Sequence, residues 1–406
     1  MDAVGRTSGR MPLAPVGEEL SPPERTRFAR HVILPGIGDT GQRRLRAARV
    51  LVVGAGGLGS PILLYLAAAG VGQLTVVDDD VVESTNLQRQ VVHGVADVGR
   101  PKVDSAVAAL RALAPDVAVT PVGQRLTADN ILALVADHDV VVDGADNFPT
   151  RYLVGDACAR LGVPHVWGSV YQHDAQTSVW WAGEGPCYRC VFPTPPPPGA
   201  VPSCSTGGVL GASCGAVGSV MAEEVVKLLV GGGEPLVGRL LLHDAWRQEW
   251  STLKVAADPD CVVCGAAADP QRPLGIEEEV ALESESASAA GEPALPSISV
   301  AALALRLRDR DAGADAFVLV DVREPGEREV VTIPGAVAVP LAQVRHGEGD
   351  GLAHGADGIP TLVYCKSGAR SAEAVRLLRQ RGVDAIDVTG GVLAWVRDVD
   401  PSLSTY

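Results

Sequence analysis

The chain has 406 residues, a formal net charge of −15 and 47% apolar residues, which is enough for about one to three domains with substantial cores. The acidic balance argues against general nucleic-acid binding, which needs a basic face to displace counterions. No apolar run approaches the ~18 residues that span a membrane, and the N-terminus lacks the apolar stretch of a signal peptide. These features predict a cytoplasmic protein with neither nucleic acid nor membrane as partner.

The N-terminal part of the sequence indicates a tail followed by a helix. Residues 1–20 are rich in Gly, Pro and Arg without periodicity, which is typical of a disordered tail. A helix is expected to start at Ser21, whose hydroxyl can accept a first-turn amide while Glu24 reaches back to it. That helix carries Arg30, which composition alone would make a solvated charge.

Strands and helices then alternate through a first domain at 21–270. A mostly parallel sheet covered by helices on both faces, a Rossmann-like α/β fold, follows from this order. Two later apolar runs indicate further strands, antiparallel to the rest. The expected strands are Val50–Val53, Leu74–Val77, Asp139–Asp143, Ser178–Trp181 and Leu240–His243, and the expected helices are Ser60–Gly70, one beginning near Pro101, and Val217–Val230.

A glycine-rich turn, Gly54-Ala55-Gly56-Gly57-Leu58-Gly59, joins the first strand to the first helix of the sheet. Glycines let the backbone approach a phosphate, and the helix N-terminus offers free amides. Asp78 ends the next strand, where a carboxylate can bind ribose hydroxyls. This pattern alone fits a nicotinamide-dependent oxidoreductase as well as an ATP-binding enzyme.

Charged residues beyond Asp78 favour ATP. Arg89 and Lys102 can neutralise a triphosphate and the charge that develops at its α-phosphorus. Asp146, at the end of another strand, can hold magnesium. Each alone is more often a surface charge, but the set suggests nucleotidyl transfer.

These motifs, with Asn86-Leu87-Gln88-Arg89-Gln90, Pro101-Lys102 and Asp143-Gly144-Ala145-Asp146-Asn147, resemble the adenylating enzymes of the ubiquitin-activating superfamily. The nearest branch activates ubiquitin-like sulfur carriers and includes the molybdopterin-synthase adenylyltransferase and its thiamine-pathway equivalent. The resemblance implies a homodimer in which Arg30 reaches the ATP of the partner subunit. It also implies ATP and Mg²⁺ bound by Gly54, Gly56, Gly57, Gly59, Asp78, Asn86, Arg89, Lys102, Asp146 and Asn147.

Four of the eight cysteines form two C-x-x-C pairs, Cys187/Cys190 and Cys261/Cys264. Each pair can supply two tetrahedral positions, so the four thiolates predict a closed, structural Zn²⁺ site. Cys158 and Cys214 have no motif context and are expected to be structural.

A second domain is predicted at 298–406, after an acidic Ser/Ala-rich linker at 271–297. Strands are expected at Phe317–Val322 and Thr361–Tyr364, and a helix at Ser371–Arg381. Between them lies the loop Cys365-Lys366-Ser367-Gly368-Ala369-Arg370. Its amides, the helix dipole and Arg370 would favour a thiolate on an exposed Cys365.

This second domain resembles rhodanese. The matching motifs are Asp321-Val322-Arg323-Glu324, Ile333-Pro334-Gly335-Ala336, the Cys365 loop and Gly390-Gly391-Val392-Leu393-Ala394-Trp395. The resemblance implies a smaller α/β fold and a persulfide on Cys365. The four residues between Cys365 and Arg370 favour sulfur over the wider pocket of related phosphatases.

Together the two domains predict an adenylyltransferase and sulfurtransferase that converts the C-terminal Gly-Gly tail of a ubiquitin-like carrier to a thiocarboxylate. Cys204, in a proline-rich loop, is a candidate to form a thioester or to resolve the acyl disulfide, or it is an ordinary loop thiol. The carrier and pathway stay open, molybdenum cofactor synthesis among them, as does the sulfur donor: thiosulfate or a cysteine desulfurase persulfide. The alternatives are a nicotinamide-dependent oxidoreductase with a regulatory domain and a non-catalytic scaffold for carriers or a desulfurase.

Overall fold

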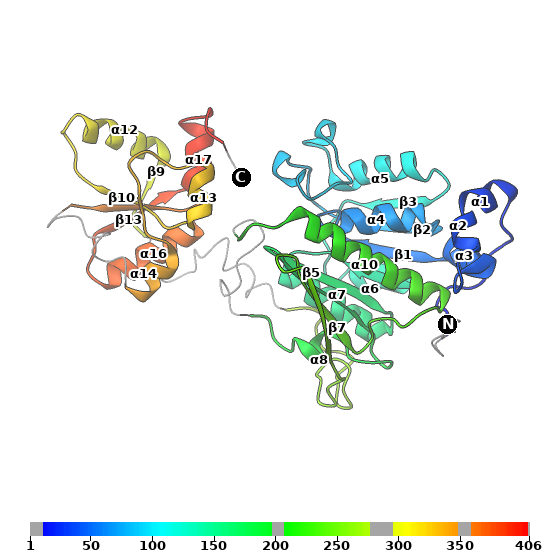
Figure 1. The fold of residues 1–406 in the computed structure, drawn as a ribbon. Coiled ribbons are helices and arrows are strands. Elements are labelled where there is room, and N and C mark those ends of the chain that lie inside the picture. The colour runs from blue at the N-terminus through cyan, green and yellow to red at the C-terminus, as the bar shows by residue number, and fades with distance from the viewer. Residues whose placement is uncertain (1–10, 197–206, 277–294, 348–358, 405–406) are drawn as a thin grey trace. The chain divides into compact units, whose positions relative to one another are not determined.

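The computed structural model describes residues 11–196, 207–276, 295–347 and 359–404. The chain divides into two compact units, Met1–Ala281 and Leu282–Tyr406. Within the described ranges each unit has its own sheet, of eight strands in the first and five in the second (Figure 1). Within the described ranges, no helix is both long and apolar enough to cross a membrane.

The sheet of the first unit has the order β3-β2-β1-β4-β5-β6-β7-β8. Its first five strands in that order are parallel, and the last three are antiparallel to their neighbours. The predicted parallel sheet with later antiparallel strands is therefore confirmed. The strands are β1 (Arg49–Val53), β2 (Gln73–Val77), β3 (Ala118–Val122), β4 (Val140–Asp143), β5 (His165–Tyr171), β6 (Asp174–Trp180), β7 (Arg239–Asp244) and β8 (Glu249–Lys254).

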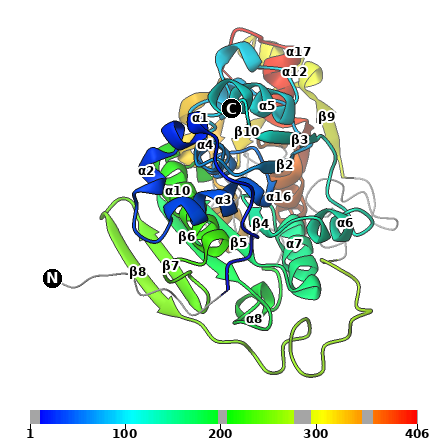
Figure 2. The ribbon, with the colours of Figure 1, turned by 90° about the vertical axis from the view of Figure 1, so that its right-hand side faces the viewer.

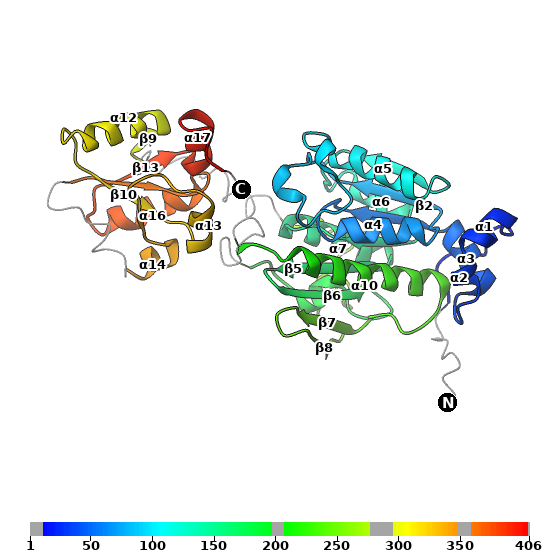
Figure 3. The same cartoon turned by 45° about the horizontal axis from the view of Figure 1, so that its top comes forward.

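Helices cover both faces of this sheet (Figures 2 and 3). One face holds α4 (Gly59–Ala68), α5 (Lys102–Leu113) and α10 (Gly211–Val230), which enclose the largest apolar core. The other holds α6 (Ile131–Ala136) and α7 (Phe148–Leu161) with a second core. Burial on both faces explains why the central strands are continuous apolar runs. The helix expected from Val217 starts earlier, at Gly211.

Three short helices, α1 (Pro22–Arg27), α2 (Ala29–Val32) and α3 (Gly38–Ala47), precede β1. The predicted capping box is present, because Ser21 and Glu24 bind each other's backbone amides. Among the described residues, the first unit also has the short helices η1 (Ser84–Asn86), η2 (Val95–Asp97) and α8 (Tyr188–Val191).

Two segments expected to lack structure are packed instead. For residues 11–20 the prediction of disorder is wrong: the Leu13 amide donates to the Leu228 carbonyl, Arg43 and Arg44 bind nearby carbonyls, and Ala14 is buried. The prediction of a linker is likewise wrong for residues 271–276, since the Gly275 amide donates to Asp156 on α7. Both segments are held by side chains of distant helices, which no local pattern reveals.

The second unit has a fully parallel sheet in the order β11-β10-β12-β13-β9. Helices α14 and α16 contact each other on one side, and α12 and α17 on the other, which confirms the smaller α/β domain. The strands are β9 (Ser297–Ser299), β10 (Val318–Asp321), β11 (Val337–Ala338), β12 (Thr361–Tyr364) and β13 (Ala385–Thr389), and the helices are α12 (Val300–Asp311), α13 (Pro325–Val330), α14 (Leu341–His346), α16 (Ala369–Gln380) and α17 (Gly391–Asp398).

Candidate nucleotide and sulfur sites

The glycine-rich turn closes tightly between β1 and α4. Gly54 has a φ of +91°, which favours glycine, and its amide donates to the Val77 carbonyl over 2.8 Å. A Cβ on Gly59 would lie 1.9 Å from the Gly54 carbonyl oxygen. Glycine is therefore required at both ends of the turn. An anion would meet the amides of the turn itself, because the Ser60 amide of α4 already donates to the Gly56 carbonyl and Pro61 has no amide hydrogen.

Asp78 follows β2 and contacts the turn directly. Its Oδ2 accepts the Ala55 amide over 2.8 Å, and its Oδ1 accepts the Asp80 amide over 2.9 Å. Burial raises the pKa of the Asp78 carboxyl, against the opposing charge of Lys102. The position suits the predicted ribose contact, because the carboxylate lies beside the phosphate turn at the end of the adjacent strand.

The two predicted phosphate-binding cations lie near the turn. Lys102, the first residue of α5, is buried, and its ammonium forms an ion pair of 2.7 Å with Asp80. Arg89 passes close to Gly57, since a Cβ there would lie 3.5 Å from the Arg89 Cγ, and it donates to the Thr85 carbonyl. A polyphosphate at the turn would compete with Asp80 for Lys102.

Other predicted nucleotide residues make structural contacts. Asn86 is buried in η1 and accepts the Glu83 amide. Asn147 caps α7 by accepting the Thr150 amide over 2.9 Å. Asp146, the predicted Mg²⁺ ligand, is exposed just beyond β4.

Sequence reasoning missed acidic residues next to Asp78. The carboxylates of Asp78, Asp79 and Asp80 lie within 4.8 Å of one another, a grouping that could hold a cation, and Asp146 is outside it. The sequence signal for this possible cation site was the run of three consecutive aspartates directly after an apolar strand.

Arg30 lies at the far end of α4 from the turn. It is exposed on α2, and a Cβ on Gly70, just after α4, would meet the ring of Phe28. The buried Gln42 joins His31 of α2 to the Ala69 carbonyl through bonds of 2.9 Å. Because α4 has ten residues, about 15 Å of helix separates this end from the glycine-rich turn.

The two C-x-x-C pairs come together as predicted. The Sγ–Sγ distances are 3.7 Å for Cys187–Cys190, 3.6 Å for Cys187–Cys261 and 3.4 Å for Cys190–Cys264. Four thiolates at about 2.3 Å from a tetrahedral Zn²⁺ would be about 3.8 Å apart, so the four cysteines fit the ion.

Burial makes two of the four thiols of this cluster costly to ionise without a cation. It raises the pKa of the Cys187 thiol and raises that of Cys264 to about 12. Beside the cluster, Arg189 forms a buried bidentate pair with Asp156 on α7, with distances of 2.6 and 2.9 Å. This pair fastens the first cysteine pair to the sheet-covering helix.

Cys365 lies between β12 and α16, but it is not the exposed cysteine that was expected: its side chain is 1% exposed. Its Sγ accepts the Gly368 amide over 3.1 Å and the Ser371 hydroxyl over 3.5 Å. The carbonyl of Cys365 accepts the Val392 amide from the double-glycine motif. The loop folds around the sulfur, which explains its burial and its contact with the Gly368 amide.

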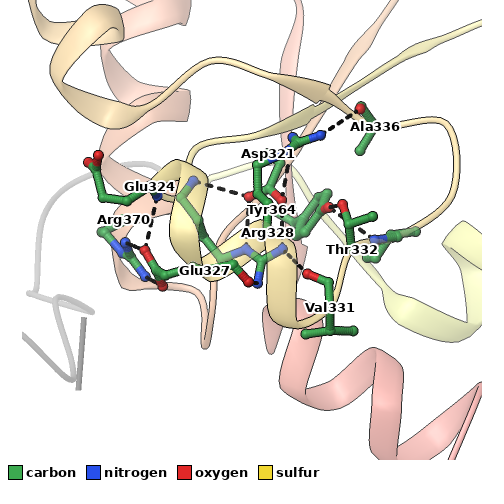
Figure 4. Close-up of polar contacts among 11 residues, drawn as sticks. Asp321, Glu324, Glu327, Arg328, Val331, Thr332, Ala336, Tyr364 and Arg370 are labelled. Atoms are coloured by element: carbon green, nitrogen blue, oxygen red, sulfur yellow. Dashed lines mark hydrogen bonds and ion pairs between the residues drawn. The ribbon is translucent and has the colours of Figure 1, made fainter. Parts of the chain in front are cut away.

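Arg370 does not lie free beside the thiol, because Glu327 on α13 binds it through two bonds of 2.7 Å (Figure 4). Behind this pair, the fully buried Arg323 forms a bidentate pair with Asp321 and bonds to the Val331 carbonyl. Glu327 was missed from the sequence, although its spacing from Glu324 is that of a capping box.

The remaining cysteines separate into three cases. Cys204 lies outside the described residues, so its predicted role stays a prediction. Cys158, on α7, is buried in the core that this helix and α6 form against the sheet. Cys214 is buried in α10, with its Sγ 2.9 Å from where a Cβ on Gly57 would lie, so it packs directly under the glycine-rich turn.

Family models match both units. The model described as the ThiF family matches residues 28–263, and the model described as the rhodanese-like domain matches residues 302–398. The probable adenylyltransferase/sulfurtransferase MoeZ of Mycobacterium tuberculosis is 43% identical over 400 residues, covering 97% of this chain and 98% of that protein. The SAMP-activating enzyme E1 of Haloferax volcanii is 54% identical over 239 residues, covering 59% of this chain and 88% of that protein.

Among solved structures, a crystal structure of E. coli MccB with MccA-N7isoASN superposes with a TM-score of 0.53 at 22% identity. It covers 59% of this chain and 74% of that one. At this identity the likeness concerns the fold alone.

Proposed function

This chain is an adenylyltransferase and sulfurtransferase of the ThiF family with a rhodanese-like domain, and we propose that it makes the thiocarboxylate of a ubiquitin-like sulfur carrier. The observation that carries the proposal is the pair of reactive turns in one chain. One is a glycine-rich phosphate turn flanked by Asp78 and Lys102, and the other is a loop that folds around the Cys365 sulfur.

In the first half-reaction, the C-terminal carboxylate of the carrier attacks the α-phosphorus of ATP. The bond from the α-phosphorus to the bridging oxygen breaks, giving a carrier acyl-adenylate and pyrophosphate. The turn amides before α4 bind the phosphates, and Asp78 binds the ribose. Lys102 and Arg89 exchange their present partners for phosphate oxygens and stabilise the developing charge.

Magnesium, when bound, supplies further charge neutralisation to the triphosphate. The carboxylate of Asp146, or those of the cluster Asp78–Asp80, would hold it. These acidic groups and the two cations fit ATP better than a nicotinamide dinucleotide, which has no triphosphate to neutralise.

In the second half-reaction, sulfur passes through Cys365. A donor persulfide R–S–SH and the Cys365 thiol give Cys365–S–SH and R–SH. The terminal sulfur attacks the acyl carbon and AMP leaves with the electron pair of the broken C–O bond. Cys204 then attacks the Cys365 Sγ, releasing carrier thiocarboxylate and leaving a disulfide that a dithiol reductant reduces.

Arg30 has a place in this reaction only if a second copy of the chain is present. In its own subunit the helix α4 lies between it and the glycine-rich turn. A homodimer in which Arg30 contacts the partner subunit's triphosphate therefore belongs to the proposal. Mixing an Arg30→Ala chain with a Lys102→Ala chain should restore part of the adenylation that each lacks alone, whereas inactive mixtures would contradict the shared site.

The four-cysteine cluster would hold a structural Zn²⁺, with no open position for chemistry. Metal analysis should find about one zinc per chain, and Cys190→Ser should lose the metal and lower the melting temperature. Cys158→Ala, which removes a thiol outside the cluster, should keep the metal. Zinc retained by the Cys190→Ser chain would contradict the assignment.

The central test is carrier-dependent exchange of labelled pyrophosphate into ATP, followed by intact mass spectrometry of the carrier. With a sulfur donor, the carrier should gain about 16 Da as a C-terminal oxygen is replaced by sulfur. Exchange without carrier thiolation would confine the enzyme to adenylation, and no exchange with any Gly-Gly carrier would refute the proposal. A Cys204→Ala chain with normal turnover would show that another thiol resolves the acyl disulfide.

A further inference from the structure

A buried histidine, His93, connects three segments that line the glycine-rich turn. Its Nε2 bonds the Ala55 carbonyl over 2.9 Å, and its Nδ1 bonds the Ser105 hydroxyl on α5 over 2.8 Å. Its own amide donates to the carbonyl of Gln90, the residue after Arg89. His93 is 7% exposed, so these contacts are shielded from solvent.

The partners of His93 determine which ring nitrogen carries the proton. A carbonyl only accepts, so Nε2 donates to the Ala55 carbonyl. Burial, the largest influence, lowers the pKa of His93 and favours the neutral ring. Its Nδ1 therefore accepts the hydrogen of the Ser105 hydroxyl.

With this tautomer, Ala55 is held at both its polar backbone atoms. Its amide donates to Asp78 and its carbonyl accepts from His93. The Ala55 carbonyl belongs to the same peptide group as the Gly56 amide, in the middle of the turn. Fixing that carbonyl against His93 therefore fixes the direction in which the Gly56 amide points.

The second bond extends the same control to the cations. Ser105 follows Lys102 by three positions on α5, so the two side chains lie on the same face of the helix, one turn apart. The hydrogen bond from the His93 backbone amide to the Gln90 carbonyl fixes the segment that carries Arg89. A single residue thus connects the turn amides with both predicted phosphate-binding cations, through its ring toward the turn and Lys102 and through its backbone amide toward Arg89.

We propose that His93 is a positioning residue for ATP, which orients the Ala55–Gly56 peptide toward the triphosphate and holds the turn, Arg89 and Lys102 in register. This inference rests on the proposed adenylation function, because it assigns a role within that nucleotide site.

Two substitutions separate the bonds of the histidine. In His93→Gln the side-chain amide nitrogen can take the place of Nε2 and still donate to the Ala55 carbonyl. In His93→Asn the shorter side chain reaches only the Nδ1 position, so the bond to Ser105 survives and the bond to Ala55 is lost. The Asn variant should raise the ATP KM in pyrophosphate exchange by about two- to twelve-fold, the range one net hydrogen bond supports, with a smaller change in kcat. The Gln variant should stay close to wild type.

A matched control is His138, a second histidine in the same unit that is also 7% exposed. It bonds the Leu134 carbonyl over 2.6 Å and the Thr75 hydroxyl over 2.7 Å, and it lies just before β4, whereas the turn follows the end of β1. His138→Asn should lower the melting temperature about as much as His93→Asn without changing the ATP KM.

Direct binding of ATP·Mg²⁺ by calorimetry, without carrier, separates this inference from the proposed function. If the wild-type chain neither binds ATP nor exchanges pyrophosphate, the adenylation function fails. If it does both, but the Asn and Gln variants of His93 share the wild-type ATP KM, the positioning role is overturned. A KM change equal to that of His138→Asn would overturn it as well.

Discussion

The two reactive turns have the same local architecture, a parallel strand, a glycine-containing loop and a helix, but they assemble their charges differently. Around the turn after β1, the charged groups come from separate segments: Asp78 after β2, Lys102 on α5 and Arg89 between them. Around the loop after β12, the atoms that contact Cys365 Sγ come from Gly368 and Ser371 of the same short segment. A site for a large diffusible nucleotide needs converging segments, whereas a sulfur carried on one atom needs only its own loop.

The cations beside the two turns, Lys102 and Arg370, also differ in how firmly an acidic partner holds them. Lys102 pairs with Asp80, which is 68% exposed at its side chain, so a phosphate can displace a weakly held partner. Arg370 pairs with Glu327, which is 5% exposed and bidentate, so this guanidinium is held in place. The first arrangement suits binding and release, and the second suits a permanent structure around the Cys365 thiol.

The largest expected effect comes from replacing Cys365, which should abolish sulfur transfer and leave adenylation intact. Cys365→Ala should lower carrier thiocarboxylate formation by roughly 10³-fold or more, because the sulfur-carrying atom is removed. Carrier-dependent pyrophosphate exchange should stay at the wild-type rate, since the glycine-rich turn is untouched. Intact mass spectrometry and exchange on the same preparation measure both. Undiminished thiocarboxylate would remove the second unit from the mechanism.

The reciprocal change is Gly59→Ala, whose Cβ would lie 1.9 Å from the Gly54 carbonyl oxygen. The turn cannot close, so pyrophosphate exchange should fall by roughly 10²-fold while persulfide loading of Cys365 continues. Gly326→Ala is the control, because a Cβ there meets nothing within 4 Å. Equal exchange by both variants would show that the turn tolerates a side chain.

A smaller effect compares two bidentate ion pairs of the second unit. Glu327→Gln should lower the unfolding free energy of that unit by about 3 kcal/mol, because the Glu327 carboxylate, which is 5% exposed, no longer neutralises the Arg370 guanidinium. Glu373→Gln breaks the pair between Glu373 and Arg345, whose side chains are 41% and 42% exposed. It should change the unfolding free energy by less than about 1 kcal/mol. Calorimetry of the full chain measures the unfolding transition of the second unit. Equal losses of unfolding free energy in the two variants would contradict the assigned difference in burial.

The smallest effect concerns pH at the N-terminal cap. The hydrogen bonds from Ser21, with Arg46, lower the pKa of Glu24 from 4.5 to about 2. A lowered carboxyl pKa stabilises the fold above pH 4.5, and this stabilisation is lost as the pH falls toward 2. Glu24→Gln should therefore reduce stability by about 1 kcal/mol or less at pH 7. Melting temperatures of the two chains should converge as the pH falls, and a constant difference would contradict the titration.

Contiguous motifs were predictable because their function depends on local backbone geometry. The glycine-rich turn, both C-x-x-C pairs and the Cys365 loop were each located from spacing, and the mostly parallel character of the first sheet followed from the alternation of strands and helices. Contacts between distant segments were not predictable in this way. Arg43 and Arg44 holding residues 11–20 and Glu327 holding Arg370 join positions that no local period relates.

The sequence by itself determined which chemical groups the chain carries: a glycine-rich turn between a strand and a helix, two C-x-x-C pairs and a cysteine in a tight loop. Only the tertiary structure decided how those groups are held, with Lys102 on Asp80, His93 on Ala55 and Cys365 buried rather than exposed. The physical reason is that a turn is specified by neighbouring residues through backbone conformation. The partner of a side chain is specified by packing, which brings together residues 22 positions apart in Lys102–Asp80 and 38 apart in His93–Ala55.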